Sequence, residues 1–165
     1  MARVESNMLP LGTTAPDFSL IDTKTNKLLH LEDLKSEHAT VIMFICNHCP
    51  FVKHVMEGIV KLANDYLSRG VSFIAISSND VEQSPDDAPD KMKQMAEQYR
   101  FPFPYLFDES QTVAKAYDAA CTPDFYLFDG SMKLVYRGQL DDSRPDNGIP
   151  VTGQDLRAAI DAVLH

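Results

Sequence analysis

The sequence predicts an α/β domain with a central mixed β-sheet, helices on both faces and an extra N-terminal hairpin. Short apolar runs rich in β-branched residues alternate with longer stretches whose apolar residues recur every three or four positions. No linker, internal repeat or low-complexity tract divides the 165 residues. We therefore expect a single domain over residues 1–165.

The N-terminal part begins with the predicted hairpin. Its two strands fall within Ala15–Asp22 and Lys27–Leu31, on either side of the turn-like stretch TKTN. The run ATVIMFIC, Ala39–Cys46, is typical of a strand buried on both faces. A helix is expected from about Pro50 to Ser68, because its apolar residues at spacings of three and four form one face.

The alternation continues through the middle of the chain. Val71–Ser77 is the next predicted buried strand, and a helix is expected to begin near Pro89. The acidic stretch Asp80–Asp90 between them is expected to be a solvated loop. Tyr105–Phe107 predicts a short strand, and Ser110 is a candidate cap for the helix that follows it.

The C-terminal part predicts another hairpin and a last helix. Phe125–Phe128 and Leu134–Arg137 flank an Asp-Gly pair, which is a strong hairpin signal. Thr152 and Asp155 have the spacing of a capping box before the final amphipathic stretch. The predicted order favours parallel strands in the middle of the sheet and an antiparallel pair at its end.

Composition excludes several classes of function. The net charge of −9 argues against nucleic-acid or anionic-membrane partners, which need basic surface. No stretch approaches the roughly 20 apolar residues of a membrane span. The start, MARVESNMLPLG, has no apolar signal segment, so we expect a cytoplasmic protein. Three cysteines do not describe a disulfide-stapled scaffold.

The stretch CNHCPFVKHV carries the strongest chemical signal. Cys46 ends a predicted strand and Cys49 opens the predicted helix. Unsatisfied N–H groups and the helix dipole favour a thiolate at that position. The two-residue spacing lets the thiols close a small disulfide, so the pair is a candidate two-electron couple. His48, if protonated, would stabilise a thiolate and make the pair more oxidising.

A metal site is the competing interpretation of the same cysteines. Structural zinc needs four ligands, usually in two close pairs. Cys46, Cys49 and either His48 or His54 supply three, and no second close pair follows in the sequence. We therefore predict no metal and no cofactor. A non-catalytic metal-binding or interaction module is kept as an alternative.

A strand running into C-x-x-C at a helix start, followed far downstream by Thr122-Pro123 in CTPDFYLFD, resembles the thioredoxin superfamily. The stretches LGTTAPDFSL and KLVYRGQLDD are similar to its AhpC/TSA and TlpA-like branch. The resemblance implies a thioredoxin-like fold with a cis bond before Pro123, facing the cysteines. It also implies that the backbone of Thr122 pairs with an extended substrate.

The resemblance implies a thiol–disulfide oxidoreductase. Cys46 is then the attacking thiol, expected to be the more exposed one, and Cys49 closes the bridge through a mixed-disulfide intermediate. The partners would be a protein or small-molecule disulfide and a thiol electron donor. Cys121, directly before Thr122, would lie near the pair as a third redox thiol or as a small buried residue.

The chain also departs from the pattern that it resembles. Asn47-His48 replaces the Gly-Pro of thioredoxin, so both residues are candidates for tuning the redox potential. If Cys49-Pro50 is aligned with the peroxidatic Cys-Pro of peroxiredoxins, Cys46 stands where their motif has Thr. The peroxidatic motif is therefore broken at that position, and a thiol peroxidase with an antioxidant role is kept as an alternative. The loop GQLDDSRP contains Arg144, a candidate contact for an anionic group or an ordinary exposed charge.

Overall fold

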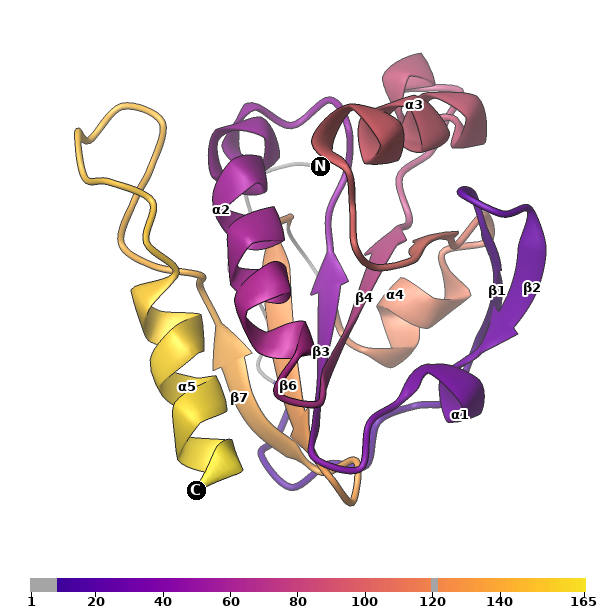
Figure 1. Cartoon of the computed structure of the whole chain (residues 1–165). Helices are drawn as coiled ribbons and strands as arrows, with labels where there is room; N and C mark the ends of the chain where they lie inside the picture. Colours follow the sequence, from indigo (N-terminus) through magenta and orange to yellow (C-terminus); the bar gives the residue numbers. More distant parts are fainter. Residues whose placement is uncertain (1–8, 120–121) are drawn as a thin grey trace.

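A computed structural model describes residues 9–119 and 122–165 of the chain. The strands are β1 (Ser19–Asp22), β2 (Lys27–His30), β3 (Ala39–Phe44), β4 (Val71–Ser77), β5 (Tyr105–Phe107), β6 (Asp124–Asp129) and β7 (Leu134–Gly138). The helices are α1 (Leu31–Leu34), α2 (Pro50–Leu67), α3 (Pro89–Tyr99), α4 (Thr112–Ala116) and α5 (Gln154–Leu164), with a 3₁₀ turn, η1, at Pro85–Asp87. Figure 1 shows their arrangement.

The strands form one mixed sheet in the order β2-β1-β5-β4-β3-β6-β7. Strand β3 pairs in parallel with β4, and β4 pairs in parallel with β5. The closing hairpin adds β6 antiparallel to β3, and the N-terminal hairpin adds β1 antiparallel to β5. The predicted α/β class, the mixed sheet and the extra hairpin are confirmed.

Two hydrophobic cores cover the two faces of the sheet. One core joins the apolar sides of α2, α3 and α5 to alternate residues of the central strands, such as Val41 and Met43. The other core places α1 and α4 against the opposite side chains of the same strands, such as Ile42 and Phe44. This alternation explains why all six residues of β3 are buried. In Figure 1, α2 and α5 lie side by side over one face of the sheet.

Several element ends differ from the sequence prediction. Strand β3 ends at Phe44, so Ile45 and Cys46 lie in the connection to α2 rather than in the strand. The N-cap of α4 is Gln111, without a side-chain cap, and the Ser110 hydroxyl instead accepts from the Thr112 N–H at 3.3 Å. The predicted cap at Ser110 is therefore wrong.

The predicted capping box of the last helix is also wrong. Gly153, with a φ of 74°, is the N-cap of α5 and offers no side chain. The Leu140 carbonyl replaces the box, because it accepts the Asp155 and Leu156 N–H groups of the first turn at 3.1 and 3.2 Å. The carboxylate of Asp141 accepts the Thr152 and Gly153 N–H groups just before the helix at 2.8 and 2.7 Å, so adjacent upstream residues fix the helix start.

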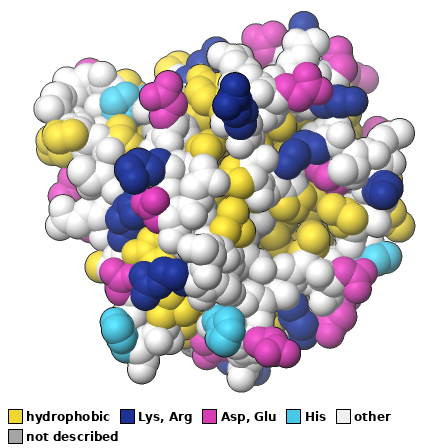
Figure 2. All heavy atoms as spheres, viewed as in Figure 1, with side chains coloured by type: hydrophobic (Ala, Val, Ile, Leu, Met, Phe, Trp, Pro, Cys, Tyr) yellow, Lys and Arg dark blue, Asp and Glu magenta, His cyan; other side chains and the backbone are white. Residues whose placement is uncertain are grey.

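The surface mixes charges of both signs. On the face seen in Figure 2, lysines and arginines are scattered among acidic side chains and do not gather into one basic patch. Within the described part of the chain, no helix is long and apolar enough to cross a membrane.

Candidate redox site

Cys46 and Cys49 lie together where the chain passes from β3 into α2. Cys46 follows the strand by two residues, and Cys49 is the N-cap of α2, directly before Pro50. Both thiols are free in this structure. The sheet and the helix therefore bring the predicted pair to one point, at the ends of the central parallel strands.

The exposure of the two thiols is the reverse of what the sequence analysis expected. Cys46 is fully buried, and Cys49 is half-buried at the helix start. Cys46 is part of the hydrophobic core that α2 covers, whereas Cys49 is only packed against that core. The expectation that Cys46 is the more exposed thiol was wrong.

The two thiols also differ in acidity. A hydrogen bond from the Cys46 side chain, together with the N–H groups of Val52 and Phe51, lowers the pKa of Cys49 to about 5, although partial burial opposes this. The same contact with Cys49, and then burial, raises the pKa of Cys46 above its ordinary value. These contacts therefore favour the thiolate at Cys49 and the thiol at Cys46.

The Thr122–Pro123 peptide bond is cis and lies against both cysteines. The Thr122 hydroxyl is 3.5 Å from Cys46 Sγ, and its carbonyl oxygen is 3.9 Å from Cys49 Sγ. The cis bond and its position beside the pair are as the resemblance implied. Cys121, the candidate third thiol, lies outside the described residues.

Asp87 is the functional residue that the sequence analysis missed. Its buried carboxylate accepts the backbone N–H groups of Asn47 and His48 at 2.7 and 3.0 Å, and it pairs with His48 Nδ1. The Asn79 amide donates to the same carboxylate at 3.0 Å. Asp87 thus holds the loop between the two cysteines, although it lies in the acidic stretch predicted to be a solvated loop.

The sequence contains only a weak marker for the buried position of Asp87. Pro85 begins the 3₁₀ turn that carries Asp87 inward, and a proline at a helix start is a recognisable marker. Nothing in the sequence distinguishes Asp87 from its exposed neighbour Asp86. The buried position depends on long-range packing, which local patterns do not report.

The two residues between the cysteines face different partners. Asn47 is buried, and its side-chain oxygen accepts the Tyr105 hydroxyl at 2.9 Å. His48 is partly exposed and turns Nδ1 to Asp87. A positive charge on His48 would therefore be compensated by the carboxylate, while Asn47 anchors the loop to β5.

Cys46, His48 and Asp87 also form a group of possible metal ligands. One atom from each lies within 4.8 Å of the others. One sulfur, an imidazole and a carboxylate are donors that Zn²⁺ accepts, but they supply only three of the four ligands of a structural site. In this structure, however, the donors are engaged with one another, since His48 pairs with Asp87 and Cys46 with Cys49.

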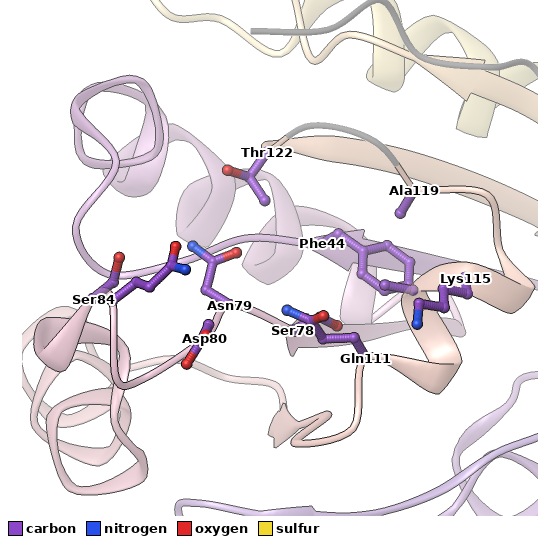
Figure 3. Close-up of a pocket in the computed structure, with 11 residues that line it drawn as sticks. Phe44, Ser78, Asn79, Asp80, Ser84, Gln111, Lys115, Ala119 and Thr122 are labelled. Atoms are coloured by element: carbon purple, nitrogen blue, oxygen red, sulfur yellow. The ribbon is translucent and has the colours of Figure 1, made fainter. Parts of the chain in front are cut away.

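A pocket of about 300 Å³ opens on one side of the cis peptide. Thr122 stands at its rim, and polar side chains from three segments surround it, among them Asn79, Gln111 and Lys115 (Figure 3). A second pocket, of about 230 Å³, lies on the other side and includes Pro123 and Phe51. Thr122 therefore lines one pocket and Pro123, on the other side of the cis bond, lines the second.

The fold and the paired thiols define a thioredoxin-fold protein. A thioredoxin-family thiol:disulfide interchange protein from Chlorobium tepidum TLS has the same fold, with a TM-score of 0.70, 17% identity and coverage of 99% of this chain and 100% of that chain. More specifically, the chain belongs to the AhpC/TSA family, whose sequence model matches residues 11–137.

Closer relatives span nearly the whole chain. An uncharacterized conserved protein from Geobacillus kaustophilus is 66% identical with a TM-score of 0.97, covering 99% of this chain and 87% of that chain. A hypothetical protein from Sinorhizobium meliloti 1021 is 48% identical with a TM-score of 0.95, covering 98% and 88%. The thiol-disulfide oxidoreductase ResA of Geobacillus kaustophilus is 25% identical over 138 residues, which are 82% of this chain and 74% of ResA.

Proposed function

We propose that this protein is a thiol–disulfide oxidoreductase in which Cys49 attacks and Cys46 closes the bridge. One observation carries the proposal: the half-exposed Cys49 has its pKa lowered to about 5, whereas Cys46 is buried against it. Thiolates, not thiols, attack disulfides. The relative named as a thiol-disulfide oxidoreductase supports the reaction class.

The proposed reaction conserves atoms and electrons. The Cys49 thiolate attacks one sulfur of the substrate disulfide, forming a mixed disulfide and releasing the other half as a thiolate. Cys46 then gives up its proton and attacks Cys49 Sγ. The Cys46–Cys49 bond forms as the bond to the substrate breaks, and the second half leaves as a thiolate that takes up the proton. A thiol electron donor returns the pair to the reduced state.

The surroundings have supporting roles in this proposal. The carbonyl of Thr122 faces Cys49, where it can accept an N–H from the backbone of an extended disulfide substrate. Asp87 fixes the loop through the backbone of Asn47 and His48, and His48 stands beside it as the group that tunes the potential. Cys121 remains a candidate third thiol that modulates turnover. The cytoplasm remains the predicted compartment, which cell fractionation tests.

Turnover assays test the proposal. Reduction of a disulfide substrate by the wild-type protein with a dithiol donor is expected to be lost in both Cys49→Ser and Cys46→Ser. Cys121→Ser is the control that keeps the described pair intact, and unchanged turnover and potential in it would remove the third-thiol hypothesis. A wild-type protein that reduces no disulfide faster than free cysteine would refute the proposed function.

A thiol peroxidase is the second candidate. Cys49 stands at a helix N-cap before Pro50 with a lowered pKa, which favours attack on a hydroperoxide. Cys49 would become a sulfenic acid as the peroxide is reduced to an alcohol, and Cys46 would condense with it to give the disulfide and water. Stopped-flow oxidation by peroxide separates the candidates, since a rate no faster than that of free cysteine dismisses the peroxidase.

A further inference from the structure

The second pocket beside the cis peptide contains a cation that the proposed chemistry does not use. The pocket measures about 230 Å³ and is lined by Phe51, Pro123 and Arg144, among others. Phe51 lies two residues after Cys49 in α2, and Pro123 directly follows Thr122, whose carbonyl faces Cys49. The lining of this pocket therefore includes residues within two chain positions of Cys49 and of the carbonyl that faces it.

Arg144 is held firmly in position. Its guanidinium carbon lies 4.8 Å from the centre of the Phe51 ring. Its Nη1 donates to the carbonyl oxygens of Asp141 and Ser143 at 3.0 and 2.7 Å, and its Nη2 donates to Gln139 Oε1 at 2.7 Å. The loop beneath it is tied to α2 by a 2.7 Å contact between Ser143 Oγ and His54 Nε2. The cation is thus oriented before any ligand arrives.

The guanidinium keeps free hydrogen-bonding capacity. Five N–H donors are available on an arginine, and three are engaged here. Among the described residues Arg144 forms no ion pair with a carboxylate. The remaining N–H donors of the guanidinium, one on Nε and one on Nη2, can donate to the oxygens of a bound anion.

The acidic residues of the pocket are engaged elsewhere. Asp141 accepts three backbone N–H groups, those of Ser143, Thr152 and Gly153. Asp124 pairs with Arg137 at 2.8 Å. The formal charges of these residues and Arg144 sum to zero, but only the Arg144 charge lacks an opposite charge or a set of N–H donors directed at it.

We infer that Arg144 binds a carboxylate of the disulfide substrate, so that the protein selects anionic disulfides. The inference rests on the proposed function. The carboxylate-bearing half lies in the pocket of Phe51 and Arg144, with its sulfur toward Cys49 and the other half toward the pocket of Thr122. Cys49 attacks the sulfur of the bound half, the other half leaves as a thiolate, and Cys46 then displaces the bound half from Cys49.

A structural role for Arg144 makes a different prediction. If the guanidinium only ties its own loop, removing it weakens the loop and slows all disulfides alike. If it binds a carboxylate, removing it slows only substrates that carry one. A comparison of charged and capped forms of one disulfide therefore separates the two roles.

The test measures the rate of Cys46–Cys49 bridge formation in the reduced protein, by acid quench and mass spectrometry. The probes are glutathione disulfide and the same compound with every carboxylate esterified. Wild type is expected to react at least about tenfold faster with the acid form, which corresponds to about 1.4 kcal/mol. Arg144→Gln is expected to lose that preference, and Arg144→Lys to keep part of it. Arg157→Gln, which removes a partly exposed cation of α5 that is paired with Asp65, is the control expected to keep the full preference.

The possible results distinguish a failure of this inference from a failure of the proposed function. Equal rates for the two probes in wild type, or equal slowing of both by Arg144→Gln, would overturn the inference and leave the proposed function standing. A wild type that reacts with neither probe would overturn both. A bridged peptide with Glu or Gln beside its cysteines distinguishes the source of the carboxylate. An Arg144-dependent preference for Glu assigns it to a polypeptide, and a preference confined to glutathione disulfide assigns it to a small molecule.

Discussion

Cys49 owes its acidity to its position at the end of α2. As the N-cap residue it lies beside N–H groups that have no partner within the helix, and two of these stabilise its thiolate. The buried Cys46 contributes the strongest contact, donating to the same sulfur. The proton that the pair retains therefore stays on the less accessible thiol, and the reactive form stays at the surface.

The pH dependence of alkylation tests this assignment. The unprotonated thiol reacts, so with a pKa of about 5 the rate at Cys49 is expected to be flat from pH 7 to 9 and to fall below about pH 5. The measurement is the iodoacetamide rate in Cys121→Ser, with the modified site located by peptide fragmentation. Cys46→Ala removes the donor of the strongest contact, so its midpoint is expected to move upward. A rate in Cys121→Ser that still climbs tenfold per unit at pH 8 would be incompatible with the assignment.

Substitution of Asp87 tests the anchor of the loop. Asp87→Asn removes a buried charge that accepts the N–H groups of Asn47 and His48, and it is expected to lower the free energy of unfolding by at least about 2 kcal/mol. The pKa of Cys46 is also expected to fall, since the Asp87 charge raises it. Urea unfolding of the reduced protein measures the first effect.

Asp86→Asn is the matched control, because Asp86 is its exposed neighbour. A change within about 0.5 kcal/mol is expected for it. Equal effects of the two substitutions would show that Asp87 does not anchor the loop.

For individual residues, the sequence predicted which side chains form the redox site better than it predicted their exposure. The two-residue spacing and the Thr-Pro pair identified Cys46, Cys49, Thr122 and Pro123, which the structure places together. Which thiol is exposed depends on how the turn into α2 packs on the core, which the two-residue spacing does not report. Asp87 was hidden because a buried and an exposed aspartate are identical in sequence.

At the scale of elements, periodicity predicted where helices and strands lie but not how they begin. The apolar spacing of α2 and the Asp-Gly turn between β6 and β7 are local signals, and both predictions are confirmed. The start of α5 depends on Asp141, which contacts it across a loop. A cap supplied from outside the helix leaves no pattern at the helix itself.

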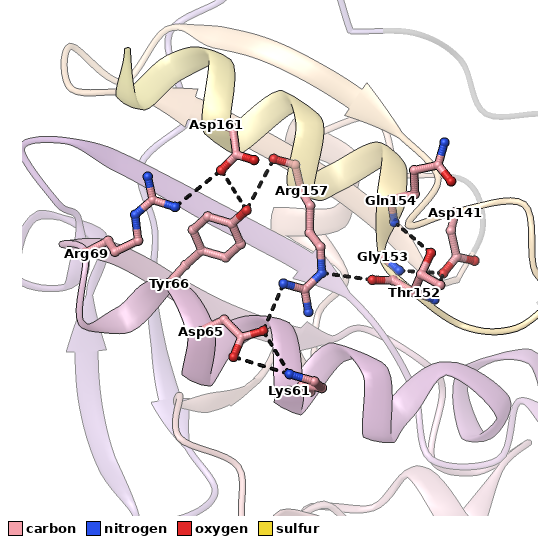
Figure 4. A network of polar contacts seen from close by, with 10 residues as sticks. All are labelled: Lys61, Asp65, Tyr66, Arg69, Asp141, Thr152, Gly153, Gln154, Arg157 and Asp161. Carbon is pink, nitrogen blue, oxygen red and sulfur yellow. Dashed lines mark hydrogen bonds and ion pairs between the residues drawn. The ribbon is translucent and has the colours of Figure 1, made fainter.

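The contact between α5 and α2 contains both a buried apolar side chain and a partly exposed ion pair, so the contributions of the two to stability can be compared. Ile160 is fully buried, whereas Arg157 reaches Asp65 across the partly exposed network in Figure 4. Ile160→Ala is expected to cost about 2–5 kcal/mol of unfolding free energy, because it leaves a cavity. Arg157→Gln is expected to cost under about 1 kcal/mol, because solvent screens such pairs. Urea unfolding compares the two, and a larger loss for Arg157→Gln would contradict this account.

For the whole molecule, the fold class followed from the alternation of strands and helices, whereas the strand order did not. Sequence patterns do not report that β1 pairs with β5 rather than with the closing hairpin. Nor do they report the two pockets, which are assembled from segments far apart in the chain, such as Phe51 and Arg144. The proposed substrate-binding surface exists only once these segments are brought together in the fold.

The coupling of protons to electrons is a property of the whole reduced protein. With Cys49 ionised and Cys46 protonated, closing the bridge releases one proton for two electrons. The midpoint potential is then expected to fall by about 30 mV per pH unit between pH 6 and 8, and by about 59 mV below pH 5, where both thiols are protonated. The stable thiolate also favours the reduced form, so the potential should lie above the roughly −270 mV of thioredoxin.

Redox titration against glutathione over this pH range measures both quantities. Mass spectrometry of the quenched samples identifies the bridged cysteines. A slope of about 59 mV per unit at pH 7 would mean that neither thiol is ionised there.

Trapping the mixed disulfide tests the central claim, that Cys49 is the attacking thiol, most directly. In Cys46→Ser, which cannot close the bridge, a disulfide substrate is expected to remain attached to Cys49 and to be seen there by peptide mass spectrometry. In Cys49→Ser, the buried and protonated Cys46 is expected to trap almost none. An adduct that accumulates on Cys46 in Cys49→Ser, with none on Cys49 in Cys46→Ser, would contradict the account.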